Sequence, residues 1–264
     1  MEVSSLRLRR SGGTSKKQQH ITQLSDPSLR IAGKPFLTAY AQGVNNTDAG
    51  KTYIWTGAPY ENTTVDDIGY VYDIIRNVSS DYSVDPSRIY ANGKSNGGGF
   101  TNLLACRPDT SSLFAAFAPV SPALYAGTHA FHNCTPSRPV PIFHTHGIED
   151  TVAPFYGRAG GSRAEPDVRV WRRQWAERNG CAKGQDAGKL APQPDSVEEV
   201  HEGVWQDVWN CTGAEVRSLS VEGLGHSWPT TLGLDTAGSP NQTANFNLTS
   251  QHLVQFYSRH SLDD

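Results

Sequence analysis

The residues with the clearest chemical potential lie in the glycine-rich stretch GKSNG at residues 93–97. This G-x-S-x-G pattern places a serine on a tight turn when a strand precedes it and a helix follows. The apolar run 89–91 and the helix-compatible run 100–105 meet that condition. Small neighbours leave room for a strained backbone at the serine. The pattern therefore predicts Ser95 as a nucleophile, with the N–H of Asn96 as one oxyanion donor.

A serine hydroxyl is a weak nucleophile and needs a base held against it. Asp150 follows the apolar segment 140–146, and His226 follows the strand-like segment 216–222. Because ligands gather at the carboxyl ends of parallel strands, we expect Ser95, Asp150 and His226 to meet at one sheet edge. Their chain order is that of α/β-hydrolases. In this arrangement His226 takes the serine proton, and Asp150 fixes the imidazole tautomer.

Other acidic and histidine residues offer alternatives to this assignment. Glu149 adjoins Asp150 and is an alternative acid, whereas we expect Asp235 to be an ordinary loop residue. His144 and His146 form an H-x-H pair of the kind that can bind zinc. No acidic residue or cysteine stands at a suitable spacing from them, so we expect neither a metal nor another cofactor.

The elements that must position these residues alternate between apolar runs and amphipathic stretches. We expect strands at 35–41, 89–91, 113–120, 140–146 and 216–222, and helices at 15–25, 66–80, 100–105, 163–179 and 249–260. Segments 43–62 and 182–200 have the composition of loops. The alternation predicts an α/β fold with a mostly parallel sheet and helices on both faces. We expect an irregular segment over residues 1–14 and a single catalytic domain over 15–264.

Composition excludes several classes of partner. The chain has 264 residues and a formal net charge of −3, without a long run of lysine or arginine. We therefore expect no nucleic-acid partner and no association with an anionic membrane surface. No stretch of 18 consecutive apolar residues is present, so no membrane-spanning helix is expected. We expect a monomer.

Cysteines and glycosylation signals point to an oxidising compartment. Four cysteines allow three pairings, and we favour Cys106–Cys134 and Cys181–Cys211 because each pair closes a local loop. Four buried free thiols are the alternative. Seven N-x-[ST] sequons favour secretion: Asn46, Asn62, Asn77, Asn133, Asn210, Asn241 and Asn247. The first ten residues have no apolar core of a signal peptide, so we expect the chain to start downstream of its true beginning.

With these residues in hand, the chain resembles fungal secreted feruloyl esterases of carbohydrate esterase family 1, close to the polyhydroxybutyrate depolymerase-like group. The resemblance covers about residues 14–260 and depends on five segments: GKSNGGGF at 93–100, WTGAPY at 55–60 with VDD at 65–67, FAAFAPVS at 114–121, His146-Gly with Asp150, and GLGHSWP at 223–229. It implies that Ser95, Asp150 and His226 form a catalytic triad. The implied reaction is hydrolysis of esters that join ferulate or another hydroxycinnamate to arabinose on xylan or pectin.

The resemblance weakens at the N-terminus. Family members have an His-Gly-Arg-like segment after a buried strand, and its loop gives a second oxyanion N–H. Here the matching stretch is RRSGGT at residues 9–14, so the chain looks shortened and without its first strands. We expect that the loss of one such donor raises the barrier by about 3 kcal/mol, or about a hundredfold in rate, unless Gly12 or Gly13 restores it.

Aromatic residues in the loops are candidates for binding the acyl group of the substrate. A phenolic acid needs a flat apolar slot with a polar anchor, and we favour Tyr60 and Trp228 among the loop aromatics. The alternatives are an acetyl-xylan esterase or polyhydroxybutyrate depolymerase with the same triad, or an impaired remnant that only binds glycan. The expected partner is feruloylated cell-wall polysaccharide.

Overall fold

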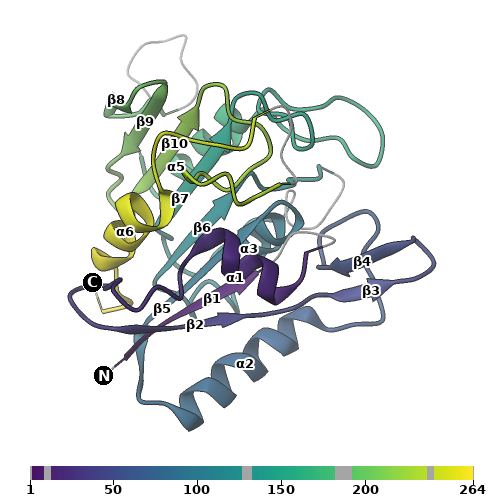
Figure 1. Ribbon diagram of the computed structural model, residues 1–264, viewed down its shortest axis with the longest axis vertical. Helices are drawn as coiled ribbons and strands as arrows, with labels where there is room; N and C mark the ends of the chain where they lie inside the picture. Colours follow the sequence, from purple (N-terminus) through teal and green to yellow (C-terminus); the bar gives the residue numbers. More distant parts are fainter. Residues whose placement is uncertain (1, 9–12, 127–132, 182–191, 237–240, 264) are drawn as a thin grey trace.

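The computed structural model describes residues 2–8, 13–126, 133–181, 192–236 and 241–263. Its central sheet has six strands in parallel, β1 (Glu2–Leu8), β2 (Phe36–Tyr40), β5 (Val84–Lys94), β6 (Ala116–Val120), β7 (Ile142–Gly147) and β10 (Val216–Val221), and two antiparallel strands, β8 (Ser196–His201) and β9 (Val204–Trp209). The strand order is β2-β1-β5-β6-β7-β10-β9-β8 (Figure 1). The predicted mostly parallel sheet is confirmed. A separate hairpin pairs β3 (Val44–Asn46) with β4 (Lys51–Ile54).

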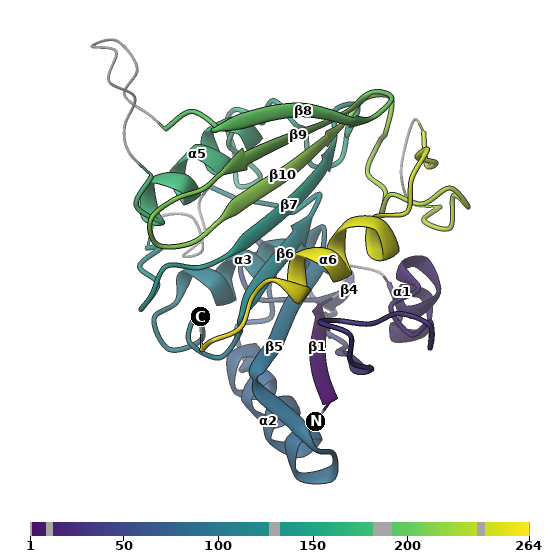
Figure 2. The same cartoon turned by 90° about the vertical axis from the view of Figure 1, so that its left-hand side faces the viewer.

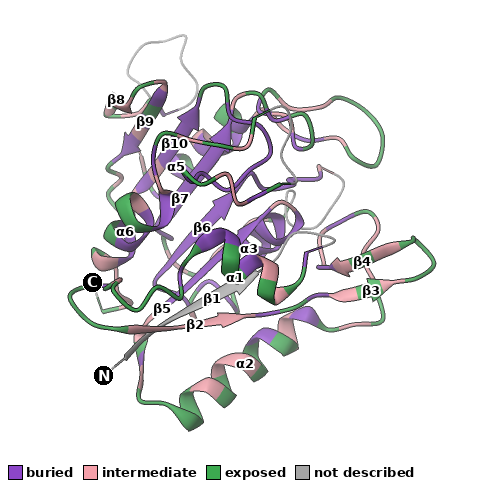
Figure 3. Ribbon diagram, in the orientation of Figure 1, coloured by how far each residue is buried: buried purple, intermediate pink, exposed green. Residues whose placement is uncertain are grey.

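Helices cover both faces of the sheet, as predicted. The helices fall into two groups, and each group packs into its own apolar cluster. The first cluster includes residues of α2 (Asp67–Asp81), α3 (Asn96–Cys106) and α5 (Val168–Arg178). The second includes residues of α1 (Ser15–Thr22), η1 (Thr249–Leu253) and α6 (Val254–Ser258). Figure 2 shows α6 crossing in front of the sheet, with α1 at the right of the view and α3 behind the strands. Buried residues concentrate on β6, β7 and α3, whereas α2 is largely exposed (Figure 3).

Local signals explain where two of the helices begin. The side chain of Asp66 accepts a hydrogen bond from the N–H of Gly69 and caps α2, and the side chain of Asp167 caps α5 in the same way through Arg169. The expected helix 66–80 is therefore confirmed almost to its ends. The expected helix 163–179 begins later, because residues 158 and 165 pair through backbone hydrogen bonds before the cap.

Three stretches that the sequence analysis treated as irregular contain strands. Residues 2–8, placed in the irregular segment 1–14, form β1, which pairs with β2 on one side and β5 on the other. Residues 43–62 contain the β3–β4 hairpin. The polar segment 182–200 contains β8, whose edge position leaves most of its side chains at least partly exposed. The β3–β4 hairpin lies outside the main sheet and β8 lies at its edge, so the period-two apolar signal is weak in these strands.

Both favoured disulfides are present, Cys106–Cys134 and Cys181–Cys211, and no described cysteine is free. None of the seven sequon asparagines is buried. Within the described residues, no helix is long and apolar enough to cross a membrane.

Candidate active site

The turn between β5 and α3 holds Ser95 in a strained conformation. Its φ is 59° and its ψ is −125°, values that cost a non-glycine residue on the order of 1–3 kcal/mol. The N–H of Ser95 donates to the carbonyl of Val120 at 3.1 Å, and its own carbonyl accepts the N–H groups of Gly99 and Ala123 at 2.9 Å each. These bonds to β6 and α3 hold the turn in place. Ser95 is half-exposed, whereas its neighbours in the turn are buried.

Two glycines of the motif are required by close approach. A Cβ atom at Gly93 would lie 2.7 Å from the Thr101 hydroxyl, and one at Gly98 would lie 2.9 Å from the Cα of Pro122. Both distances are shorter than real Cβ atoms tolerate. The glycines therefore let the first turn of α3 pack directly against the end of β5 and against the segment that follows β6.

Asp150 and His226 meet at the carboxyl ends of β7 and β10. The Nδ1 atom of His226 donates to Oδ2 of Asp150 at 2.7 Å. The other oxygen of Asp150 accepts the N–H groups of Val152 and Ala153 at 2.8 Å each. Both side chains are buried. A carboxylate with these donors holds the imidazole with its proton on Nδ1 and its lone pair on Nε2.

Burial and hydrogen bonding set the charges of this pair. Burial alone would raise the pKa of Asp150, but the hydrogen bonds from His146 and His226 outweigh it and hold the pKa well below the ordinary value. Burial, aided by the nearby charge of Lys94, lowers the pKa of His226 to about 4. At neutral pH the pair is therefore a carboxylate and a neutral imidazole, the ionisation that a general base requires.

A chain of buried side chains supports Asp150 from behind. Nε of Arg172 donates to Nδ1 of His144 at 2.9 Å, and Nε2 of His144 lies 3.3 Å from Nδ1 of His146. Nε2 of His146 lies 2.7 Å from the carbonyl of Ala153 and 3.3 Å from Asp150. Donation from Arg172 at one end and to a carbonyl at the other fixes which ring nitrogen of each histidine donates and which accepts along this chain. Burial is the main cause that holds the pKa of His144 well below its usual value, and the charge of Arg172 adds to the effect.

A buried ion pair joins the elbow to the histidine loop. Lys94 Nζ lies 2.5 Å from the carboxylate of Asp235, and both side chains are fully buried. The same ammonium donates to the backbone carbonyl of His226 at 2.7 Å. Asp235 also accepts the N–H of Trp228 at 3.1 Å. Asp235 lies in a loop, as we expected, but it also helps to fix the histidine loop: Lys94 holds the His226 carbonyl and Asp235 holds the N–H of Trp228, two residues later.

Ser95 and His226 line one cavity of about 270 Å³. The other lining residues are Lys51, Tyr60, Ala123, Tyr125, Val152, Ala153, Arg158 and Arg163. The Tyr60 and Tyr125 hydroxyls lie 3.0 Å apart. Nε2 of His226 has no hydrogen-bond partner among the described residues, Ser95 included. The two side chains therefore face the same space without a direct hydrogen bond.

One expected oxyanion donor, the N–H of Asn96, lies within the described residues. Asn96 is the first residue of α3, so the helix offers no carbonyl to its N–H. Its side chain is occupied elsewhere, since its oxygen accepts the N–H of Trp55 at 2.8 Å. The segment expected to give a second donor falls mostly on residues 9–12, including Gly12, which lie outside the described residues. Gly13 is described and buried. Strand β1 ends at Leu8, the register partner of Gly93, so the chain leaves the sheet beside the elbow.

The structure also bears on the alternative acid, the metal site and the substrate contacts that the sequence suggested. Glu149 is exposed, whereas Asp150 is buried on the imidazole, so the geometry favours Asp150. No group of three or more possible metal ligands occurs within the described residues. Tyr60 lines the cavity, but Trp228 was a wrong choice for a substrate contact. Its side chain is fully buried in the apolar cluster shared with α1 and α6. A residue two positions beyond His226 turns back into the core.

Sequence reasoning missed Lys94, Arg172 and Tyr125. Lys94 occupies a variable position of the motif, and its partner Asp235 is far along the chain. Tyr125 stood among the loop aromatics without being favoured. A charged residue between an apolar strand and a nucleophile turn was the one available signal for Lys94, because such a position is buried.

Sequence comparisons find similar proteins among fungal esterases. The chain is 30% identical over 171 residues to feruloyl esterase B of Piromyces equi, covering 62% of this chain and 30% of that protein. It is 29% identical over 189 residues to a probable feruloyl esterase C of Aspergillus clavatus, covering 72% and 60%. The chain is similar in sequence to fungal feruloyl esterases. The resemblance that its motifs suggested is therefore confirmed.

A third relative broadens the similarity. A bifunctional acetylxylan esterase/xylanase of Neocallimastix patriciarum is 38% identical over 163 residues, which cover 61% of this chain and 21% of that protein. The chain thus spans between about a fifth and three fifths of the length of these relatives. No protein-family model matches the chain.

Solved structures show the fold. An acetyl xylan esterase from Aspergillus awamori superposes with a TM-score of 0.60 at 15% identity, covering 85% of this chain and 84% of that one. SOBER1 of Arabidopsis thaliana gives a TM-score of 0.52 at 15% identity, covering 98% and 99%. The feruloyl esterase-like chain has the α/β-hydrolase fold, as predicted.

Proposed function

We propose that this protein is a serine esterase that hydrolyses hydroxycinnamoyl esters of plant cell-wall polysaccharides. One observation supports this most strongly. A strained serine at a strand-to-helix turn shares a cavity with a neutral histidine whose other ring nitrogen is held by a buried carboxylate. Nucleophile, base and orienting acid then have the relationship that acyl transfer requires.

In the proposed acylation step, the Oγ atom of Ser95 attacks the ester carbonyl carbon while Nε2 of His226 takes its proton. The C=O electrons move onto the oxygen, and the N–H of Asn96 stabilises this oxyanion. The tetrahedral intermediate then collapses as the imidazolium gives its proton to the departing sugar oxygen. This leaves a free sugar hydroxyl and an acyl group on Ser95. Asp150 stays ionised throughout and stabilises the imidazolium.

Deacylation repeats these steps with water. Nε2 of His226 removes a proton from the water as its oxygen attacks the acyl carbon, and the second oxyanion forms at the same place. Collapse breaks the bond to Ser95 Oγ, which recovers its proton from the imidazolium. The products are a free carboxylic acid and the starting enzyme. The protein supplies all proton transfers from its own side chains.

The choice of acyl group follows from the cavity and the relatives. Two of the named relatives are feruloyl esterases, and Tyr60 and Tyr125 give the cavity flat apolar surfaces with a hydroxyl pair at 3.0 Å. Planar aromatic acids suit such a surface. Two disulfides and seven unburied sequons support secretion, and we propose a monomer that acts outside the cell.

A second candidate is an acetyl-xylan esterase with the same residues in the same roles. The 38% identity to a bifunctional acetylxylan esterase/xylanase favours it. An acetyl group would leave the two tyrosines without a contact, whereas a cinnamoyl group uses them. The ratio of kcat/KM on methyl ferulate to that on acetylated xylan separates the two candidates.

The test is hydrolysis of methyl ferulate by the wild type and by Ser95→Ala. The variant should fold normally and lose all measurable turnover, and mass spectrometry should find a feruloyl adduct on the wild-type peptide that contains Ser95. Ser80→Ala, on the exposed side of α2, is the matched control. Turnover by Ser95→Ala equal to that of the control would overturn the nucleophile assignment. A wild type that binds xylan fragments but hydrolyses no ester would show a binding protein instead.

A further inference from the structure

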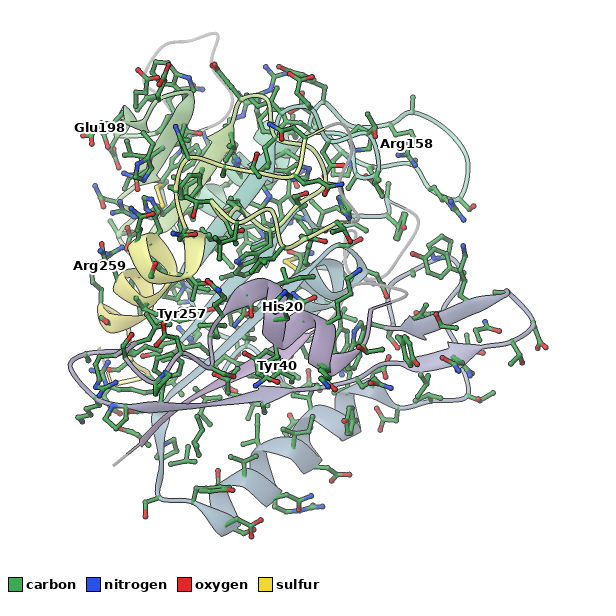
Figure 4. All side chains as sticks on the ribbon, in the orientation of Figure 1. His20, Tyr40, Arg158, Glu198, Tyr257 and Arg259 are labelled. Carbon is green, nitrogen blue, oxygen red and sulfur yellow. A yellow bond between two sulfur atoms is a disulfide. The ribbon has the colours of Figure 1, made fainter. Side chains whose placement is uncertain are left out.

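Three of the residues that line the cavity are cations, and all three are at least partly exposed. Lys51 comes from the start of β4, and Arg158 and Arg163 come from the loop between β7 and α5. Figure 4 shows Arg158 on that loop, extending beyond the sheet edge. We propose that these three side chains form a subsite for the carboxylate of a uronate residue in an acidic polysaccharide chain. The inference deepens the proposed esterase function, since it assigns the sugar side of the same site.

Two of the three cations lie over one aromatic ring, and the third is held on the neighbouring loop. The Lys51 ammonium and the Arg163 guanidinium each lie 5.6 Å from the centre of the Tyr60 ring. Arg158 is held by a hydrogen bond to the carbonyl of Val152 at 2.7 Å. The contacts with the Tyr60 ring orient Lys51 and Arg163 without neutralising their charges. Ring and cations together suit a sugar that packs on Tyr60 and presents a carboxylate.

No carboxylate among the described residues forms an ion pair with this cluster. Among the described residues, no ion pair involves Lys51, Arg158 or Arg163, and no aspartate or glutamate lines the cavity. The acid that interacts with both arginines is Glu165, and burial raises its pKa to about 7, so it is only partly ionised at neutral pH. Three cations and no carboxylate in the lining are not what composition alone would produce on a chain of net charge −3.

Exposure decides which part of the substrate the cations meet. Arg163 is exposed and Lys51 and Arg158 are half-exposed, whereas His226 on the inner wall is buried. A cavity of about 270 Å³ admits an acyl group but not a polymer. The sugar chain must then cross the mouth, where the cations lie. An arginine guanidinium binds a carboxylate through two parallel hydrogen bonds, which gives selectivity for uronates over neutral sugars.

The experiment measures binding rather than turnover, so that its failure differs from failure of the esterase proposal. Isothermal titration of the Ser95→Ala protein compares tetragalacturonate with xylotetraose and with monomeric galacturonate. We expect the acidic tetramer to bind about tenfold more tightly than the neutral one at low salt, with the preference reduced in about 0.5 M NaCl. Arg163→Glu and Lys51→Glu should abolish the preference, and Arg163→Lys should keep part of it.

The matched control is Arg76→Glu on the exposed face of α2, which makes the same charge change away from the cavity. It should retain the preference for the acidic tetramer. Equal binding of both tetramers, equal loss in the control, or monomeric galacturonate binding as tightly as the tetramer would overturn the inference. If the wild type hydrolyses no ester while the acidic preference persists, the esterase proposal fails and the uronate subsite stands.

Discussion

The inner wall and the mouth of the cavity are built differently. On and behind the inner wall, Asp150, His226, Lys94 and Asp235 are buried and joined by contacts between 2.5 and 2.7 Å. At the mouth, Lys51, Tyr60 and Arg163 are at least partly exposed and meet through ring contacts of 5.6 Å. This difference indicates that the residues proposed for catalysis are held in fixed positions, whereas the residues proposed to select the substrate lie on exposed parts of the surface that can adjust.

The largest effect should come from the inner wall. Asp150→Asn keeps the shape but removes the acceptor that fixes the His226 tautomer, so kcat should fall by about four orders of magnitude. Steady-state kinetics on methyl ferulate measures this, with Glu149→Gln as the exposed neighbouring control. A loss of less than tenfold at Asp150, or an equal loss at Glu149, would move the acid away from Asp150.

The buried Lys94–Asp235 pair should show its role through pH. Lys94→Met alone leaves a buried carboxylate without its cation and should cost about 3–5 kcal/mol of unfolding free energy. Lys94→Met with Asp235→Leu removes both charges and should recover most of that stability. If the pair only stabilises the fold, the double variant has wild-type kinetics.

We expect instead a changed pH profile in the double variant. The proposed base works only while His226 is neutral, so wild-type kcat/KM should fall as pH drops through about 4. Since the charge of Lys94 helps to lower the pKa of His226, its removal should shift this acid limb to higher pH. An unshifted limb with unchanged kcat would show that the pair does not act on His226.

The smallest effect should come from the mouth. Tyr60→Ala removes a ring that lines the cavity, and we expect KM for methyl ferulate to rise about tenfold with little change in kcat. Trp228→Phe is the contrasting variant, because Trp228 is fully buried in the core. It should lower Tm without altering KM. The reverse pattern would restore Trp228 as a substrate contact.

Much of the site could be predicted because its residues follow parallel strands. A strand that is buried on both faces has a nearly continuous apolar run, as at β6 and β7, and the residue after it lies at the ligand edge of the sheet. This brought Asp150 and His226 together from positions 76 residues apart. Local loop closure likewise identified both disulfides.

Other features gave no local signal. Strand β8 is an edge strand of mixed polar residues, with Val197 half-exposed, and its pairing depends on β9 rather than on its own periodicity. The ion pair between Lys94 and Asp235 depends on how the loop that carries Asp235 folds over the end of β5. Trp228 was misjudged because proximity to His226 along the chain does not fix the direction of a side chain.

By itself the sequence determined the alternation of strands and helices, the strained serine turn and the order of serine, acid and base, because periodicity, glycine spacing and strand ends are local properties. Only the tertiary structure decided which charges neutralise one another. Lys94 finds Asp235 in the interior, while Lys51, Arg158 and Arg163 converge on the cavity with no ion-pair partner among the described residues. Charge pairing depends on distances through space, and the fold sets those distances by packing loops from separate strands against one another.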